Sequence, residues 1–365
     1  MSLLLTAFGF DALNPWLDDQ RADGPVVIVD NAGRGLDDHA GILAMALDEL
    51  RAGGRSADVV DVGGGDLTPL RRAAAVVMTG GDPFRLLGDL RRSGADRLLV
   101  AARGLPIAGQ SAGAIVCGPD LSPIRLTSPF APAADQDLTG LALTDTLVLP
   151  HHGQPERNAR HRQAALRVGA GKHTPQALTP LWDDETLIEA DGGWRIQRGG
   201  LLTREAQNDD AAAVADVFHQ AAVAAWSGFL GSAIERQTDA LWAQRIATAG
   251  ARFLVTEDAV GVLSFVCWTA NDDGASGEID LLYTHPRAWG NGSGRRLLER
   301  ATWRLLCEGF RDAVLWTEAR NERALGVYRR NGWRTDGAVD EREFAGVPIR
   351  NLRHRLDLTR YAGGA

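Results

Sequence analysis

Residues 105–117 read Leu-Pro-Ile-Ala-Gly-Gln-Ser-Ala-Gly-Ala-Ile-Val-Cys, and this stretch decides how the first half of the chain is interpreted. A short apolar run ends at Gly109, and a second begins at Ala112 with the spacing of a helix. Ser111 stands between them, flanked by small residues that a strained turn can accommodate. Strand, sharp turn and helix are the setting of a nucleophilic serine. The alternative is a glycine-rich turn that merely packs a helix on a sheet.

Apolar runs alternate with helical patterns on both sides of this turn. The runs that predict buried strands are 26–30, 58–62, 74–79, 105–109, 146–150 and 185–190, and helical spacing is clear at 39–51 and 84–90. Short apolar strands separated by helices are typical of an α/β domain with a mainly parallel sheet. Near residue 200 the pattern changes to that of an α+β domain with a mixed sheet. We therefore expect two domains, at residues 1–198 and 201–365.

Composition limits the classes of function. With 365 residues, 45% of them hydrophobic and 24% charged, the chain is typical of a soluble protein of about two domains. It has no apolar run of roughly 18 residues and no basic segment at its start, so we expect a cytoplasmic protein without a membrane partner. The net charge is −8 and neither half is basic, which argues against nucleic-acid binding. Three widely separated cysteines predict neither a disulfide scaffold nor a metal site.

A nucleophilic serine needs a base, and the chain contains eight histidines. His151 and His152 follow the apolar run 146–150, at the carboxyl end of a predicted strand. Ligands of open α/β sheets bind at such strand ends. The other histidines of this half lie in helical or loop contexts, where a histidine is more often structural: His39, His161 and His173.

Three segments in combination point to a known family. They are Thr79-Gly-Gly-Asp-Pro-Phe-Arg-Leu-Leu, Gly109-Gln-Ser-Ala-Gly-Ala-Ile and Pro150-His-His. Together they resemble the peptidase E (aspartyl dipeptidase) and cyanophycinase-like serine peptidases, which share the class I glutamine amidotransferase-like fold with a serine in place of the cysteine nucleophile. The resemblance covers about residues 1–198. It implies Ser111 as nucleophile and His151 as base. For the acid that orients the histidine, Asp120 is the best match, and Asp183 or Asp184 is the alternative.

The same resemblance implies an oxyanion hole formed by backbone N–H groups of Gly81 and Ala112. This chain departs from the family there. Where the family often has Gly-Gly-Gly-Asn-Thr, it reads Gly80-Gly81-Asp82-Pro83, so the charge of Asp82 could alter substrate choice.

Two arginines after the histidine suggest how a substrate is recognised. Arg157 and Arg160 keep the spacing of the peptidase E segment that supports recognition of a substrate aspartate. Arginine suits a carboxylate because it can donate two parallel hydrogen bonds. A solvated helix face is the alternative for each of them.

A second glycine-rich loop opens a helix in the other half. Residues 285–296 read His-Pro-Arg-Ala-Trp-Gly-Asn-Gly-Ser-Gly-Arg-Arg after the predicted strand 277–284. Successive glycines let backbone N–H groups converge on an anion. A nucleotide-binding P-loop would need a lysine, and Lys172 is the chain's single lysine. A dinucleotide fingerprint would need the first strand of a βαβ unit, which this context fits poorly.

With the downstream segment Asn321-Glu-Arg-Ala-Leu-Gly-Val-Tyr-Arg-Arg-Asn-Gly-Trp, this loop resembles the GNAT N-acetyltransferases over about residues 201–358. Trp289 stands where that family usually has arginine or glutamine. The resemblance implies acetyl-CoA as the cofactor of this half, whereas none is expected for the first half. Residues implied to hold acetyl-CoA are Leu282, Tyr283, Thr284, Trp289, Gly290, Asn291, Gly292, Ser293, Gly294, Arg295 and Asn321.

The GNAT resemblance also implies catalytic groups. Tyr328 matches the usual acid, which returns a proton to the CoA thiolate. Glu278 is the expected base for the amine, with an exposed strand carboxylate as its alternative. Early helices between Trp226 and Trp242 are expected to form the acceptor pocket.

We therefore predict a bifunctional enzyme that hydrolyses a small, aspartyl peptide or amide and acetylates an amine. One hypothesis joins the two reactions on a shared peptide-like compound, as in detoxification. One alternative is an acetyltransferase whose N-terminal domain is a degenerate binding or regulatory module, and another is a sensor of acetyl-CoA without acceptor chemistry. The expected partners are small molecules or short peptides, and a homodimer is an option that the sequence leaves open.

Overall fold

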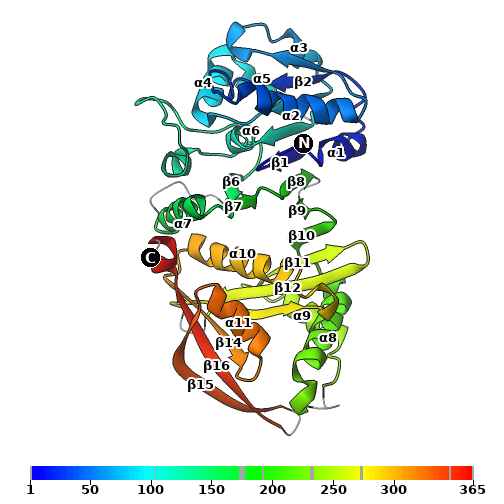
Figure 1. Ribbon diagram of the computed structural model, residues 1–365, viewed down its shortest axis with the longest axis vertical. Helices are drawn as coiled ribbons and strands as arrows, with labels where there is room; N and C mark the ends of the chain where they lie inside the picture. Colours follow the sequence, from blue (N-terminus) through cyan, green and yellow to red (C-terminus); the bar gives the residue numbers. More distant parts are fainter. Residues whose placement is uncertain are drawn as a thin grey trace. The chain divides into compact units, whose positions relative to one another are not determined.

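The computed structural model of the chain (Figure 1) describes residues 2–102, 104–171, 177–190, 193–230, 234–271, 274–344 and 347–363. Lys172 and His173 lie outside these residues. The chain divides into two compact units, Met1–Gly199 and Gly200–Ala365. Within the described ranges, no helix has both the length and the apolar character needed to cross a membrane.

The sheet of the first unit follows the strand order β9–β8–β1–β5–β4–β2–β3. Its strands are β1 (Leu3–Thr6), β2 (Val26–Val29), β3 (Ala57–Val60), β4 (Ala75–Met78), β5 (Ile107–Gln110), β8 (Thr186–Ala190) and β9 (Gly193–Arg198). Neighbours from β1 to β3 in this order run parallel, whereas β8 and β9 are antiparallel additions. The expected mainly parallel sheet is thus confirmed for β1, β5, β4, β2 and β3, and the β8–β9 hairpin makes the complete sheet mixed.

Helices pack on this sheet because its strands are apolar on both faces; β1, β2, β4 and β5 are buried along their whole length. The helices are α1 (Leu13–Asp19), α2 (His39–Ala52), α3 (Thr68–Arg72), α4 (Pro83–Ser93), α5 (Ala95–Ala101), α6 (Ala112–Val116) and α7 (Pro155–Gly169). Leu13 of α1 and Leu50 of α2 share one core cluster with Ile28 of β2 and Val77 of β4.

The expected strand near 146–150 forms, but it does not belong to the main sheet. β6 (Thr146–His152) pairs in parallel with β7 (Ala177–Trp182) as a separate two-stranded sheet. β7 was not predicted; Pro180 within it is unfavourable in a long ladder, which weakens its pattern.

The second unit is built on a mixed sheet, as expected, with the strand order β10–β11–β12–β13–β14–β16–β15. Its strands are β10 (Leu201–Glu205), β11 (Arg252–Asp258), β12 (Gly261–Ala270), β13 (Gly277–Thr284), β14 (Asp312–Glu318), β15 (Arg334–Phe344) and β16 (Val347–Asp357). Its helices are α8 (Ala211–Leu230), α9 (Asp239–Ile246), α10 (Ser293–Cys307), α11 (Glu322–Arg330) and α12 (Leu358–Gly363). Only the pair β13–β14 is parallel among the pairings described within this unit.

An irregularity in β13 changes which side chains face which helices. The pairing of β13 with β12 places Ile279 opposite Trp268 and Leu281 opposite Cys267, so Asp280 is an extra, bulged residue. Before the bulge, Gly277 faces α10, because a Cβ there would lie 2.4 Å from Leu305. After it, Leu281 belongs to the core cluster beneath α8 and α9. One extra residue therefore reverses the faces of the strand, as bulges do.

Candidate active sites

The turn around Ser111 has the strained geometry of a nucleophile elbow. β5 ends at Gln110, α6 begins at Ala112, and Ser111 between them has φ 48° and ψ −105°. A positive φ is costly for a residue with a side chain, so the surroundings must hold it. Gly109 and Gly113 permit the close packing: a Cβ on Gly109 would lie 2.6 Å from the Gly113 backbone, and one on Gly113 would lie 2.2 Å from the carbonyl oxygen of Met78.

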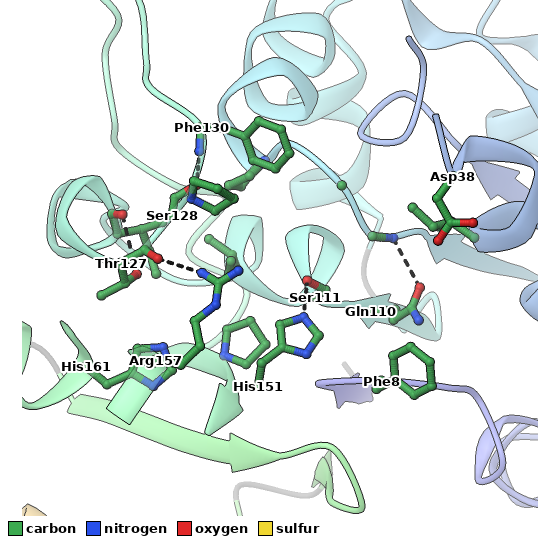
Figure 2. Close-up of a pocket in the computed structure, with 18 of the residues that line it drawn as sticks. Phe8, Asp38, Gln110, Ser111, Thr127, Ser128, Phe130, His151, Arg157 and His161 are labelled. Atoms are coloured by element: carbon green, nitrogen blue, oxygen red, sulfur yellow. Dashed lines mark hydrogen bonds between the residues drawn. The ribbon is translucent and has the colours of Figure 1, made fainter. Parts of the chain in front are cut away.

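Ser111 is the first member of a hydrogen-bonded line of three side chains. Its Oγ lies 3.1 Å from Nε2 of His151, which extends from β6. Nδ1 of His151 lies 2.8 Å from Oδ1 of Asp183, which follows β7. Oδ2 of Asp183 accepts a hydrogen bond from Nε2 of Gln154 at 3.1 Å, which orients the carboxylate. In Figure 2, Ser111 and His151 point toward each other inside the pocket.

The acid that contacts His151 is Asp183, the alternative, and not Asp120. Oδ1 of Asp120 accepts hydrogen bonds from the backbone N–H and the hydroxyl of Ser122, at 2.8 and 2.7 Å. Both ring nitrogens of His151 are already bonded, to Ser111 and Asp183. The preference for Asp120 is corrected accordingly, because the parallel pairing of β6 with β7 brings Asp183 beside the histidine.

The glycine loop after β4 lies beside Ser111: a Cβ on Gly80 would lie 3.4 Å from the Cβ of Ser111. Gly81 has φ 133°, and a Cβ there would lie 2.2 Å from the carbonyl oxygen of Ala32, so no other residue fits. The neighbouring Gly80 donates its N–H to Oε1 of Gln110 at 3.2 Å. Ala112 is the first residue of α6, so its N–H has no acceptor within the helix. Of the two groups expected to form the oxyanion hole, the Ala112 N–H follows Ser111 directly in the chain, and Gly81 belongs to the loop that lies beside Ser111.

Ser111 opens into a pocket of about 250 Å³ (Figure 2). Arg157 lines it and donates from Nη1 to the carbonyl oxygen of Thr127 at 2.6 Å. Burial, with a contribution from Arg160, lowers the pKa of the Arg157 guanidinium. Arg160 is exposed and is not among the residues that line the pocket, so only Arg157 of the two arginines expected to support recognition lines it.

Asp82, whose charge was expected near the substrate, caps a helix instead. Its Oδ1 accepts from the backbone N–H groups of Phe84 and Arg85, at 2.9 and 3.2 Å, at the start of α4. Such an N-cap satisfies donors that the helix cannot. A carboxylate that does line the pocket, and that the sequence did not single out, is Asp38 at the start of α2.

A buried histidine pair lies behind this site. The Nδ1 atoms of His152 and His161 are 3.2 Å apart, both residues are almost fully buried, and His161 lines the pocket. Burial lowers the pKa of His161 well below its usual value, with a further contribution from His152. The helical context of His161 predicts a structural histidine, whereas its position on α7 makes it part of the pocket lining.

The second unit contains a cavity of about 980 Å³. Its lining includes every residue that was expected to hold acetyl-CoA. Glu278 and Tyr328, the expected base and acid, line it too. The cavity opens where β13 and β14 separate, because their pairing ends at Ile279 and Leu315. Trp226 lines it, whereas Trp242 is fully buried in the core and contacts Phe218 and Phe265.

The glycine loop of this cavity has a shape that suits phosphate. Gly290 and Gly292 have φ 91° and 86°, and Gly292 begins α10 without a side-chain cap. A Cβ on Gly294 would lie 2.7 Å from Oγ1 of Thr284, so the helix approaches β13 closely. The N–H groups of Gly294 and Arg295 lie in the first helical turn, where no intrahelical acceptor exists, so they are available to an anion.

Tyr328 and Asn321 lie on opposite ends of α11. Tyr328 is 7% exposed, and burial raises the pKa of its hydroxyl to about 12, so the group stays protonated. Oδ1 of Asn321 accepts from the N–H of Ala324 at 3.1 Å, so Asn321 caps α11 as well as lining the cavity.

A second carboxylate, Asp280, was missed although it is close to Glu278 in sequence. It lines the cavity at the bulge of β13, where its side chain keeps an exposed surface; partial desolvation by the cavity walls raises the pKa of its carboxyl group, and Arg245 opposes this shift. No simple strand alternation predicts this position, because the bulge depends on the pairing with β12.

Two family models match the chain. The model described as Peptidase family S51 matches residues 10–195, just over half of the chain, and the model described as Acetyltransferase (GNAT) family matches residues 218–333. An uncharacterized peptidase of Listeria innocua is 30% identical over 127 residues, which cover 33% of this chain and 58% of that protein. Peptidase E of Streptomyces coelicolor is 33% identical over 129 residues, covering 35% and 52%.

Among acetyltransferases, mycothiol acetyltransferase of Beutenbergia cavernae is 37% identical over 81 residues, which cover 22% of this chain and 27% of that protein. The chain therefore spans about half the length of the two peptidase relatives and about a quarter of the acetyltransferase.

Proposed function

Because this chain belongs to peptidase family S51 and carries a GNAT acetyltransferase domain after it, we propose that it is a bifunctional enzyme with two independent chemistries. The first unit hydrolyses a small peptide or amide through Ser111, His151 and Asp183. The second unit transfers an acetyl group from acetyl-CoA to an amine. The observation that carries the proposal is the line of hydrogen bonds of 3.1 and 2.8 Å that joins the three side chains.

In the hydrolytic half, Oγ of Ser111 attacks the scissile carbonyl carbon while Nε2 of His151 takes the hydroxyl proton. Asp183 accepts from Nδ1, which holds the imidazole tautomer and stabilises the imidazolium. The N–H groups of Gly81 and Ala112 stabilise the oxyanion, each contributing about 3–4 kcal/mol of barrier reduction. His151 then gives the proton to the leaving amine. In the second step, a water molecule attacks the ester carbonyl while Nε2 of His151 takes its proton, and His151 returns that proton to Oγ of Ser111 as the ester bond breaks and the carboxylic acid leaves.

An acidic substrate residue is the specificity that the pocket supports best. Arg157 presents a guanidinium whose position is held by the Thr127 carbonyl. Because desolvated arginine binds carboxylates strongly through paired hydrogen bonds, we propose an aspartyl peptide or amide as substrate. Asp-X dipeptides compared with Asn-X dipeptides test this, since an Asn side chain offers no negative charge to Arg157.

In the second half, the loop from Gly290 to Arg295 and the cavity around it fit acetyl-CoA, as the free N–H groups at the start of α10 indicate. When bound, acetyl-CoA supplies the acetyl group as an activated thioester. Oη of Tyr328 holds the proton for the departing thiolate, which its raised pKa of about 12 supports. Glu278 accepts the proton of the amine, and Asp280 is a second candidate for this base because it lines the cavity at the bulge.

Two assays test the proposal. A serine-directed phosphonate should label the wild-type protein and fail to label Ser111→Ala, and acetyl-CoA should turn over with at least one amine of a panel. If the phosphonate labels neither protein, the first unit is a degenerate binding module and the acetyltransferase alternative holds. If acetyl-CoA binds but no amine is acetylated, the second unit is a sensor.

We also propose that the two halves act on one peptide-like compound, so that cleavage of its amide and capping of its amine together detoxify it. The observation behind this hypothesis is that the two domains are fused in one chain. The substrates of each half should then share a core structure; unrelated substrates would reject this hypothesis while leaving both activities intact.

A further inference from the structure

One stacked pair stands at the edge of the second cavity. The guanidinium carbon of Arg323 lies 3.9 Å from the ring centroid of Trp289. Trp289 is itself held, because its Nε1 donates to the carbonyl oxygen of Thr284 at 2.8 Å. Arg323 is near the start of α11, and both side chains line the cavity. The pair thus joins the glycine loop to α11 at a point that faces the cavity.

The charge of Arg323 has no acidic partner within the described part of the chain, unlike two arginines near it. Arg320 pairs with Glu318 at 2.7 Å, and Arg329 pairs with Glu322 at 3.8 Å. Stacking on an aromatic ring uses the flat face of a guanidinium and leaves its N–H edge available. Trp289 therefore fixes the arginine without neutralising it.

Arg323 is also part of a wider distribution of charge along the cavity. Arg295 of α10 and Arg330 of α11 line it as well, and neither forms an ion pair among the described residues. Glu278 and Asp280 of β13 line the same cavity. A cavity in a chain of net charge −8 thus gathers uncompensated arginines on two helices, which suits a ligand with several negative charges.

We propose that Arg323, positioned by Trp289, binds a phosphate group of coenzyme A with the edge of its guanidinium. The inference rests on the proposed use of acetyl-CoA by this cavity. Coenzyme A offers a diphosphate and a 3′-phosphate, and a planar guanidinium can pair with two oxygens of either. Because the ring holds the side chain in place, less conformational freedom is lost when the phosphate binds.

The test is the affinity of the full-length protein for coenzyme A and for 3′-dephospho-coenzyme A, measured by calorimetry without any acceptor. Arg323→Gln should weaken coenzyme A binding about tenfold, as expected for loss of one charge-assisted pair. Arg329→Gln, on the same helix but outside the cavity lining, is the matched control and should leave the affinity unchanged. Trp289→Ala should weaken binding less than Arg323→Gln, and the double variant should be no weaker than Arg323→Gln alone.

The two ligands distinguish the phosphates. If Arg323→Gln weakens binding of both ligands equally, the guanidinium meets the diphosphate; if it weakens coenzyme A alone, it meets the 3′-phosphate. Either result supports the proposal. A thermal midpoint that falls in Arg323→Gln while both affinities stay at the wild-type value would show a purely structural pair and overturn it. A wild-type protein that binds neither ligand would reject the proposed cofactor itself, which is a separate outcome.

Discussion

The two candidate sites of this chain are constructed by different means. In the first unit, Ser111, His151 and Asp183 come from three separate segments and are joined by hydrogen bonds of 3.1 and 2.8 Å. In the second unit, Glu278 and Tyr328 are brought together as lining of a cavity of about 980 Å³. Under the proposed function, the contrast reflects the source of the reactive group. A hydrolase must activate a weak nucleophile of its own, whereas an acetyltransferase receives an activated group with its cofactor and needs mainly shape, charge and proton carriers.

The difference predicts that single substitutions have larger effects in the first site than in the second. In a chain of groups that act as a unit, removing one disables the others. In a site that works by binding and proton transfer, each group contributes a separate and smaller factor.

Ser111→Ala should have the largest effect. Because the substitution removes the nucleophile, we expect peptide or amide hydrolysis to fall by about 10⁴-fold or more. The measurement is kcat for the best substrate, with acetyl transfer by the same variant as control, which should stay at the wild-type rate. A decrease of less than tenfold would show that hydrolysis does not use this serine.

Asp183→Asn should come next, with a decrease in kcat of about 10³–10⁴-fold, because an amide stabilises the wrong tautomer of His151. Asp120→Asn is the matched control. Since Asp120 contacts Ser122 rather than His151, its variant should lose less than tenfold in kcat. The opposite ranking of the two variants would restore Asp120 as the catalytic acid.

Tyr328→Phe tests the proton donor of the second site. A positioned general acid contributes about 10²–10⁴-fold, and we expect a loss near the lower end because a thiolate is a good leaving group. Acetyl transfer should therefore fall about 100-fold, while coenzyme A affinity and hydrolysis by the first unit stay unchanged. An unaltered kcat would remove Tyr328 from the chemistry.

Asp280→Asn tests the second carboxylate and carries a pH signature. The raised pKa of Asp280 means that its basic form is lost, as pH falls, at a higher pH than for an ordinary aspartate. Charged or titratable groups coupled to it are Arg245 of α9, Tyr283 of its own strand and Cys267 of β12; Glu278 of the same strand lines the same cavity. If Asp280 is the base, Asp280→Asn should lower kcat/KM for acetyl transfer about tenfold and remove the acidic limb of the pH profile. If Glu278→Gln does so instead, Glu278 is the base.

The smallest expected effect concerns stability rather than rate. The pKa of His161 is lower in the folded protein than in the unfolded chain, so the unfolded state binds more protons as pH falls below about 6.5. The stabilising effect of the neutral histidine is therefore complete above that pH and decreases below it. The thermal midpoint of the first unit should fall between about pH 7.5 and 5.5, by about 2–4 °C for each kcal/mol lost. His161→Asn should flatten this dependence; an equal slope in the variant would assign it to other groups.

Much of the local structure could be predicted because it depends on neighbouring residues. The elbow at Ser111 follows from a strand, small flanking residues and a helix in immediate succession. The glycine loop before α10 is equally local, and its residues all line one cavity. In both cases the backbone conformation requires glycine or a small side chain at set positions, and the sequence displays that requirement.

The misplaced predictions share a different cause. The preference for Asp120, the influence of Asp82 on substrate choice and the use of Arg157 and Arg160 in recognition were all inferred from positions along the chain. Which carboxylate reaches His151 depends on the pairing of β6 with β7, segments about 30 residues apart. Spacing cannot report such a contact, because any segment that returns to the same strand could supply the acid.

The sequence by itself therefore predicted the resemblance to two families, the proximity of Ser111 and His151, and a glycine loop at the start of α10. Each of these depends on short-range sterics: a strained turn, a helix start, a glycine where a Cβ would collide. The tertiary structure alone decided that Asp183 orients the histidine, that Asp280 enters the second cavity and that Arg323 lies on Trp289. Those contacts are set by strand register, a bulge and the approach of a helix, which arise from long-range packing and leave no local pattern.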